Sequence, residues 1–549
     1  MLRLDNLKLN PDQALEPDAH LREAAARTLG ITPAEIDALA IIRRSLDARK
    51  KRELHFVYAV ELALKKQNRE RALLRAGRAQ AVAPYRYLLP QLPPSELPPV
   101  VVGAGPAGLF AALTLAEAGQ RPLVLERGAA VEERQHLVER FWTSGALDVQ
   151  TNVQFGEGGA GTFSDGKLQT GIKNHRLHKM LLEMVEAGAP ASILTESKPH
   201  IGTDFLAPMV RGLREKIIRL GGNFCFGARV EDIAFKNGAL HALSYVDSKT
   251  GQSHRLLADT LVLAIGHSAR DTFAMLATKG LALAPKPFAV GLRIEHPQRW
   301  LDQAQYGPWA GHPALGAADY KLAVHLADGR GVYSFCMCPG GRVVAAASEA
   351  DGLVVNGMSD YRRDAANANS AILSAVHPAD FCANDTNPLA GLAFQRKLEQ
   401  AAFALGGGDY FAPVQRLADF QARCPSRALG AVEPSYRPGY RPAQLDSCLP
   451  AGFGDVLRNG LQQMAERLPG FDLGDAVLSG VESRSSSPVR ILRGEDGQAL
   501  GITGLYPVGE GAGYAGGISS AAVDGMRAAE QILAKRGDYP ELFCYNRHR

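Results

Sequence analysis

A glycine-rich turn between two short apolar segments is the feature that most constrains how this chain can fold. Three consecutive valines at 100–102 are followed by Gly103-Ala104-Gly105-Pro106-Ala107-Gly108, which opens the apolar helical run Leu109–Ala118. A second apolar segment, Pro122–Leu125, then ends at Glu126. A strand, a glycine turn, a helix, a second strand and an acidic residue in this order are typical of a dinucleotide-binding βαβ unit. The sequence therefore predicts an α/β fold built around a parallel sheet.

The residues of this turn have separate physical roles. Gly103 permits the tight turn, Gly105 lets backbone amides approach a pyrophosphate, and Gly108 lets the helix pack closely on the strand. The partial positive charge at the helix N-terminus favours the phosphates. Glu126 is predicted to accept hydrogen bonds from ribose hydroxyls. The predicted contacts of this unit are Gly103, Gly105, Pro106, Ala107, Gly108, Glu126 and Arg127.

A second glycine-lined helix start lies near the C-terminus. Gly504–Gly513 leads through Gly516-Gly517 into a helix predicted over Ile518–Lys535, whose apolar residues recur at spacings of three and four. A nicotinamide-dependent enzyme seldom needs such an element so far beyond its glycine turn. The predicted cofactor contacts here are Gly509, Glu510, Gly517 and Ile518.

The two glycine segments together resemble FAD proteins of the glutathione-reductase and hydroxybenzoate-hydroxylase kind. In that broad group the C-terminal strand-glycine-acid-helix element meets the ribityl and pyrophosphate, and its helix points at the flavin. The resemblance therefore implies FAD as the cofactor and places Glu510 at the acidic position. A helix dipole aimed at the flavin would stabilise negative charge on the reduced ring.

Two further segments are similar to parts of the same group. The predicted helix Pro208–Leu220 and strand Phe224–Ile233 resemble the segment whose backbone meets the adenine, which implies a contact near Val230. Thr260–Gly266 resembles the strand that closes the FAD domain, which implies contacts at Ala264 and Gly266.

Three other segments carry a narrower likeness, to FAD-dependent dehydrogenases allied to geranylgeranyl reductases. This family has no settled substrate, so the likeness implies the cofactor and leaves the reaction open. In related proteins a glycine-rich loop brings backbone against the pyrophosphate and flavin ring, which implies contacts at Gly158, Gly159 and Thr162. The segments that carry the likeness are Phe155–Lys167, Phe335–Gly341 and Glu482–Pro488.

Four side chains are candidates for chemistry. Lys167 could offset charge on phosphate or reduced flavin, and it is also a candidate catalytic residue. Cys336 and Cys338 are predicted to face the same side of a strand, either as a redox pair beside the flavin or as ordinary packed thiols. His267 could carry protons near the cofactor, or it could be a supporting or surface histidine. No sequence motif for a metal site or for a serine nucleophile is present.

The chain divides into five predicted segments. Residues 1–90 read as a basic βαββαβ module of the ferredoxin-like kind, and 91–99 as a proline-rich linker. The FAD-binding domain is predicted over 100–285 and again over 481–549, with an α+β substrate-binding domain inserted at 286–480. Because that insert shows no second dinucleotide fingerprint, any NAD(P)H is expected to dock only transiently as a reductant.

Composition bears on the cellular location of the chain and on its possible binding partners. No apolar run is long enough to cross a bilayer, and seven cysteines without zinc-ligand spacing suggest a cytoplasmic protein with mostly free thiols. Residues 1–95 carry an excess of basic side chains, which favours a solvated surface but leaves nucleic-acid docking open. The tightest basic cluster is Arg43, Arg44, Arg49, Lys50, Lys51 and Arg52.

These observations predict a Rossmann-type FAD-binding domain with an inserted substrate domain and an N-terminal ferredoxin-like module. The predicted function is an FAD-dependent oxidoreductase that passes hydride through flavin N5 to or from a small organic substrate. Two alternatives stay open: a flavin-dependent protein that modifies or docks tRNA or other RNA through the basic module, and a flavin redox sensor without turnover.

Overall fold

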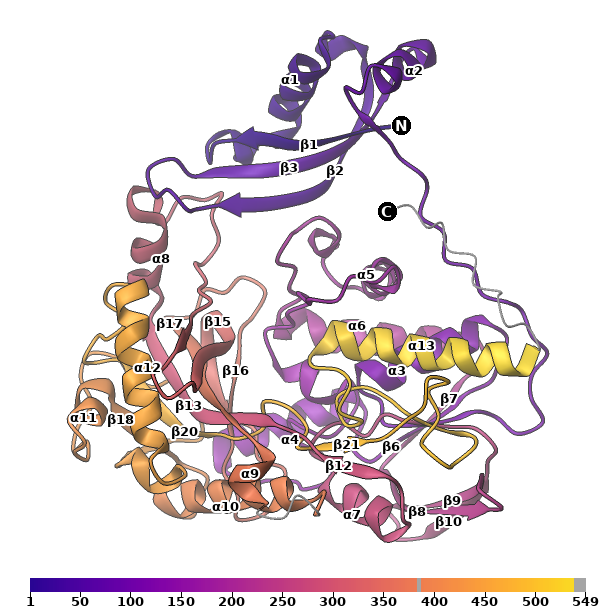
Figure 1. The fold of residues 1–549 in the computed structure, drawn as a ribbon, viewed down its shortest axis with the longest axis vertical. Helices are drawn as coiled ribbons and strands as arrows, with labels where there is room; N and C mark the ends of the chain where they lie inside the picture. The colour runs from indigo at the N-terminus through magenta and orange to yellow at the C-terminus, as the bar shows by residue number, and fades with distance from the viewer. Residues whose placement is uncertain (383–386, 538–549) are drawn as a thin grey trace.

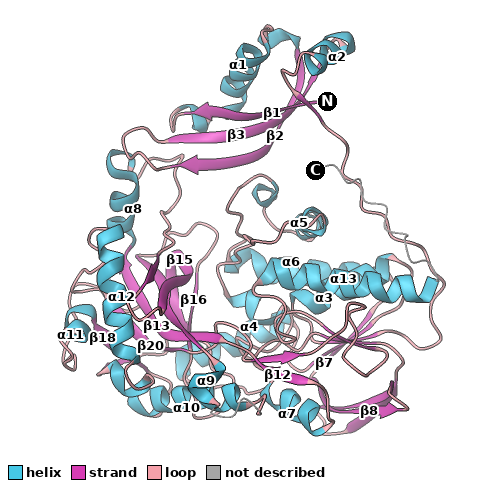
Figure 2. Cartoon of the chain, viewed as in Figure 1, coloured by secondary structure: helices cyan, strands magenta, loops and turns pink. Residues whose placement is uncertain are grey.

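The computed structural model describes residues 1–382 and 387–537. Figure 1 shows a small N-terminal module at the top of the molecule and two larger parts below it, one of them built from a sheet with long helices. The half that carries the glycine turn contains both strands and long helices (Figure 2). The predicted α/β class with a parallel sheet is confirmed.

The N-terminal module is a four-stranded antiparallel sheet with two helices. Its strand order is β2-β3-β1-β4, so the second strand of each βαβ half, β2 or β4, lies at an edge, as predicted for a ferredoxin-like βαββαβ unit. Leu21, Ala25 and Leu29 of the first helix are buried in its core. The elements are β1 (Leu2–Leu9), α1 (Pro17–Leu29), β2 (Ile36–Asp47), β3 (His55–Leu64), α2 (Gln67–Arg75) and β4 (Gln80–Ala81). Residues 82–99, all within the described range, contain neither helix nor strand.

The glycine turn belongs to a five-stranded parallel sheet. Its order is β22-β11-β5-β6-β7, which brings the strand before the C-terminal glycine segment into the same sheet as the strand before Gly103. The strands are β5 (Val100–Val102), β6 (Leu123–Glu126), β7 (Asn223–Phe226), β11 (Leu261–Leu263) and β22 (Leu505–Pro507).

Helix α3 (Pro106–Glu117) lies at the centre of this domain. Its residues from Ala107 to Ala116 are all buried, because the sheet covers one side and α13 (Ile518–Gly537) packs along the other. This close packing of α3 against α13 places two segments that are far apart in the sequence side by side. The other helices of the domain are α4 (Val131–Ser144), α5 (Arg176–Glu186), α6 (Thr203–Arg219) and α7 (Arg270–Thr278).

One predicted strand of this domain is in fact two. The apolar stretch 224–233 was expected to form a single strand, but Gly227 adopts φ +71° and breaks it. The chain therefore leaves the parallel sheet after β7 and enters a separate antiparallel sheet, because the left-handed conformation redirects the backbone at low cost only at glycine. That sheet consists of β8 (Ala228–Lys236), β9 (Ala239–Asp247) and β10 (Ser253–Leu257).

The inserted domain is built on a larger, mostly antiparallel sheet of order β14-β15-β17-β13-β20-β18-β19, with β16 paired to β15. Its central strands β13 and β20 are almost entirely buried, and both connect directly to the parallel-sheet domain, next to the short ladder of β12 (Leu283–Pro285) and β21 (Val489–Ile491). The strands are β13 (Phe288–Pro297), β14 (Ala323–His325), β15 (Gly331–Ala345), β16 (Val355–Met358), β17 (Asn367–Val376), β18 (Ala412–Arg416), β19 (Tyr440–Pro442) and β20 (Val477–Glu482). The helices are α8 (Gln298–Tyr306), α9 (Pro378–Phe381), α10 (Ala390–Leu405), α11 (Leu417–Gln421) and α12 (Phe453–Arg467).

Within residues 1–382 and 387–537, we find no helix that is both long and apolar enough to span a bilayer. The same ranges contain no group of three or more His, Cys, Asp or Glu side chains placed to hold a metal ion.

Candidate functional site

A cavity of about 720 Å³ lies where the two glycine segments meet the inserted domain. Gly103 and Gly105 line one side of it, and Gly509 and Gly517 line another. These sides belong to neighbouring elements, since a Cβ atom added to Gly509 would lie 2.8 Å from the Cβ atom of Ala107. Two segments about 400 residues apart in the sequence therefore form one cavity.

Most of the predicted contact residues lie in the wall of this cavity. They come from the glycine turn, from the ends of β6 and β11, from β8, and from the start of α13. Those in the wall are Gly103, Gly105, Pro106, Ala107, Glu126, Arg127, Gly159, Val230, Ala264, Gly266, Gly509, Glu510, Gly517 and Ile518. The chemistry candidates Lys167, His267 and Cys336 also line it.

Four of the predicted residues do not line the cavity: Gly108, Gly158, Thr162 and Cys338. A Cβ atom on Gly108 would lie 1.8 Å from the carbonyl oxygen of Gly103, so this glycine serves the packing of α3 on the strand. Gly158 has φ +84°, and a Cβ atom there would collide with the Thr162 hydroxyl at 2.0 Å. Thr162 and Cys338 are fully buried. Gly108, Gly158 and Thr162 therefore shape the cavity from behind.

The carboxylate of Glu126 connects the glycine turn to the glycine-rich loop through hydrogen bonds. It accepts hydrogen bonds from the backbone amides of Ala104 (2.8 Å), Gly128 (3.0 Å) and Gly156 (2.9 Å). The side chain also lines the cavity. Because a carboxylate offers about four acceptor positions, one remains for a ribose hydroxyl beside these three amides.

We expect Glu126→Ala to weaken FAD binding and to lower stability, because three buried amides lose their acceptor. An unsatisfied buried donor costs about 1–3 kcal/mol, and the ribose contact is lost as well. FAD titration of the purified variant measures the first effect, and urea unfolding of the apoprotein measures the second. Glu139→Ala, at an exposed position on α4, is the matched control. Unchanged FAD affinity in Glu126→Ala would show that the ribose contact is misassigned.

Two glycines in the cavity wall fit a bound dinucleotide. A Cβ atom on Gly105 would have only the Cα atom of Gly159 nearby, at 3.8 Å, and one on Gly516 would meet no atom within 4 Å. Neither residue has a positive φ angle. Neither packing nor backbone conformation requires glycine at these positions, and both leave room for a ligand to approach the backbone closely.

Arg134 supports the glycine-rich loop and was not predicted from the sequence. Its guanidinium is fully buried and donates hydrogen bonds to the carbonyl oxygens of Asn152 (3.0 Å), Val153 (3.0 Å) and Gly156 (3.2 Å). A lone arginine on an amphipathic helix is usually solvated, so the sequence carries no signal for this role. The loop is therefore held in a fixed shape from inside the protein.

A buried ion cluster joins the two large domains next to the cavity. Glu399 on α10 accepts hydrogen bonds from Arg270 at the start of α7 (2.8 and 3.0 Å) and from Arg484 after β20 (2.7 and 2.9 Å). Burial opposes ionisation, but Arg484 and Arg270 together lower the pKa of Glu399 to about 2. The cluster therefore carries a charged carboxylate at neutral pH.

His267 lies beside this cluster, in the cavity wall. Burial and the nearby charges of Arg484 and Arg270 lower the pKa of His267 to about 3. Its Nδ1 atom is 2.8 Å from the Ser268 hydroxyl. The imidazole is therefore uncharged at neutral pH and can act only as a neutral hydrogen-bonding group.

Glu510 occupies a buried place at the start of the C-terminal glycine segment. Burial raises its pKa to about 7, although the Lys286 ammonium lowers it in part. A carboxyl group that titrates near neutrality can both donate and accept hydrogen bonds to ligand hydroxyls. This suits the ribityl position that the resemblance assigns to Glu510.

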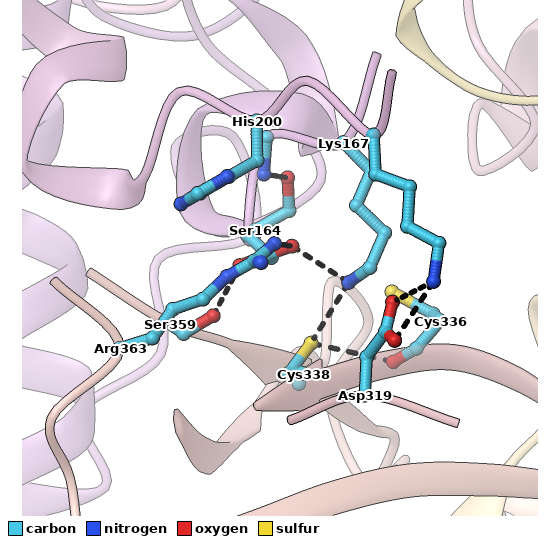
Figure 3. A network of polar contacts seen from close by, with 12 residues as sticks. Ser164, Lys167, His200, Asp319, Cys336, Cys338, Ser359 and Arg363 are labelled. Carbon is cyan, nitrogen blue, oxygen red and sulfur yellow. Dashed lines mark hydrogen bonds and ion pairs between the residues drawn. The ribbon is translucent and has the colours of Figure 1, made fainter. Parts of the chain in front are cut away.

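A polar network with two thiols adjoins the cavity, and Lys167 and Cys336 of this network line it (Figure 3). Lys167 is 2.7 Å from the Asp165 carboxylate and 3.8 Å from Cys338 Sγ. Asp165 also accepts two hydrogen bonds from Arg363, at 3.0 and 2.6 Å. The strand is not regular here, because Cys336 has φ +43° and β15 bulges, but the two cysteine side chains still lie next to each other.

Three of the six residues in the basic cluster of the N-terminal module pair with carboxylates. Arg44 contacts Glu196 at 3.1 Å, and its backbone pairs with Thr195 and Ser197 of the parallel-sheet domain. Two further cations form local pairs, Arg49 with Asp47 and Lys50 with Glu53. These pairs reduce the free positive charge of the cluster.

RNA docking through the N-terminal module remains a prediction. It is tested by measuring how RNA binding depends on salt for the protein with and without residues 1–90.

A glycine-lined dinucleotide cavity between a Rossmann-type domain and an inserted sheet domain is typical of an FAD-dependent oxidoreductase, and two family models agree with this. Residues 98–281 match pyridine nucleotide-disulphide oxidoreductases, and residues 287–485 match the C-terminal domain-like part of FAD-dependent proteins. Residues 1–63 match a domain of unknown function.

The chain is 46% identical to an uncharacterized protein of Clostridium beijerinckii over 97% of its own length and 99% of that protein. It belongs to this family of uncharacterised FAD-dependent oxidoreductases, and its cofactor is FAD. Solved structures are more distant. Quinol fumarate reductase FrdA of E. coli is 12% identical, covering 81% of this chain and 71% of that one, with a TM-score of 0.36. A geranylgeranyl bacteriochlorophyll reductase-like protein of Thermoplasma acidophilum is also 12% identical, covering 83% and 81%, with a TM-score of 0.34.

Proposed function

We propose that this protein is a dehydrogenase or reductase that transfers hydride between a small organic substrate and FAD. The observation that carries the proposal is that one cavity is lined both by the glycine segments and by side chains of the inserted domain. Tyr333, Phe335 and Asn356 of that domain share its wall with Gly105 and Gly517. Bound FAD supplies hydride chemistry at its N5 atom.

The chain's own residues bind and orient at the two ends of this cavity. At the nucleotide end, the N-terminus of α3 and the carboxylate of Glu126 suit the pyrophosphate and the ribose. At the other end, the Lys167 ammonium and the Asn356 amide are available to position a polar group of the substrate. Inserted-domain side chains cover this end and keep bulk water from the reacting atoms.

The predicted domain boundaries belong to the same proposal. Residues 100–285 and 481–549 would hold the cofactor, and 286–480 would hold the substrate. Of the last segment, residues 538–549 lie outside the described range. Because only one dinucleotide fingerprint is present, we infer that NADH or NADPH docks transiently at the substrate end when it serves as the reductant.

Anaerobic mixing of the holoprotein with NADH and with NADPH tests the direction of the reaction. Bleaching of the visible flavin band by either nucleotide supports a reductase cycle. Bleaching only by an organic hydride donor supports a dehydrogenase cycle. If neither kind of donor bleaches the flavin, and organic acceptors do not speed reoxidation of the dithionite-reduced protein, the enzyme proposal is wrong and a redox sensor is favoured.

A further inference from the structure

The two thiols at the substrate end of the cavity have a geometry that ordinary packed cysteines do not need. Between the pairs Phe335–Ala371 and Cys338–Asn369, strand β15 has one more residue than its partner β17. This bulge contains Cys336 with φ +43°, a left-handed conformation that is strained for any residue except glycine. Strain of this kind is concentrated at functional sites.

The bulge brings Cys338 back towards Cys336. The Cys338 thiol donates to the carbonyl oxygen of Cys336 at 3.3 Å, and Arg293 donates to the same oxygen at 3.2 Å. In a regular strand, side chains two residues apart stand too far from each other for a disulfide. The bulge changes this geometry, because β15 has an additional residue there and the two cysteine side chains interact.

The surroundings of the pair favour a thiolate. Lys167 and Arg363 place two positive charges around the single carboxylate of Asp165, so one positive charge is left over beside the sulfurs. Arg293 is also close, but Glu482 neutralises it. The adjacent Cys338 side chain, and then the charges of Lys167 and Arg293, lower the pKa of Cys336 against the effect of burial.

The two cysteines differ in access. Cys336 lines the cavity and is partly exposed, and its neighbour Phe335 is 41% exposed. Cys338 is fully buried. A small oxidant that enters the cavity therefore reaches Cys336 first, with Cys338 behind it.

We propose that Cys336 and Cys338 form a peroxide-reactive dithiol, which a small hydroperoxide converts to an intramolecular disulfide. The Cys336 thiolate attacks one peroxide oxygen, so that an S–O bond forms, the O–O bond breaks, and the other oxygen leaves as an alcohol or water after taking a proton. The Cys338 thiol then attacks the sulfenic acid. An S–S bond forms, the S–O bond breaks, and hydroxide leaves as water with the thiol's proton. The pair loses two electrons and the hydroperoxide gains them.

The proposal concerns only side chains of this chain and does not rest on the proposed oxidoreductase function. It is tested on the reduced full-length protein, with FAD bound and after its removal, by adding hydrogen peroxide and then alkylating the free thiols for mass spectrometry. We expect Cys336 and Cys338 to become protected together and dithiothreitol to release them. Exposed Cys424 and fully buried Cys448 are internal comparators, and Cys336 should react at least about tenfold faster than either.

Three variants separate the roles. Cys338→Ser should leave Cys336 as a sulfenic acid that dimedone traps, Cys336→Ser should abolish the reaction at this pair, and Lys167→Met should slow it about tenfold. The proposal is overturned if wild-type Cys336 reacts no faster than Cys424, or if it proceeds to the sulfinic acid while Cys338 stays a free thiol. The wild-type measurement decides this even if a variant fails to fold.

Discussion

Replacing Glu399 by alanine is expected to destabilise the protein by about 3–5 kcal/mol, the cost of leaving a buried ion pair without one partner. Glu399 is only 1% exposed, and it holds the guanidinium groups of both Arg270 and Arg484. Its loss would leave the buried Arg484 guanidinium without its carboxylate partner, whereas Arg270 would keep only Glu349. Urea unfolding of Glu399→Ala and of the wild type measures the difference.

A surface ion pair supplies the control for this prediction. Asp409 and Arg441 are 2.7 Å apart, but both side chains are more than 40% exposed, so Asp409→Ala should cost at most about 1 kcal/mol. Equal losses of stability in Glu399→Ala and Asp409→Ala would contradict the account.

The contribution of Glu399 to stability depends on pH with a definite sign. Because the folded-state pKa of Glu399 is lowered to about 2, its contribution is complete above its unfolded-state pKa and disappears as the pH falls towards 2.

Gly105→Val is expected to weaken FAD binding strongly while leaving the apoprotein almost as stable as the wild type. The Cβ atom of the new side chain would have only the Cα atom of Gly159 nearby, at 3.8 Å, but it lies at the cavity wall where the pyrophosphate is expected. Overpacking of this kind costs about 1–3 kcal/mol, which corresponds to roughly 5- to 150-fold in affinity. Fluorescence titration with FAD and thermal unfolding of the apoprotein measure the two effects.

Gly316→Val is the matched control, because Gly316 is exposed, has no atom within 4 Å of an added Cβ, and lies outside the cavity wall. It should bind FAD like the wild type. If Gly105→Val also binds FAD with wild-type affinity, the phosphates do not pass over this turn.

The sequence predicted the parts of the site that depend on local pattern. The Gly103–Gly108 turn, the helix start at Ile518 and the acidic residues Glu126 and Glu510 are all readable, because each lies between segments of clear periodicity. Element ends were predicted only to within a few residues. The helix expected over Leu109–Ala118 begins at Pro106 and ends at Glu117.

The parts that the sequence did not predict depend on contacts between distant segments. Glu399 and Arg270 are 129 positions apart in the sequence. The residues around each of them give no sign that the two side chains form an ion pair. The Cys336 bulge is equally hidden, because alternation along a strand gives no sign of an inserted residue. Glu126 was expected to contact the ribose, but its three backbone amide partners could be seen only after the loops were placed.

Titration of the purified apoprotein with FAD and with FMN tests the central claim, that two distant segments form one site for a complete flavin adenine dinucleotide. We predict one FAD bound per chain, and FMN bound at least about tenfold more weakly, because the adenosine half should contact the wall near Glu126 and Val230. Failure to bind FAD, or equal affinity for FAD and FMN, would contradict the account.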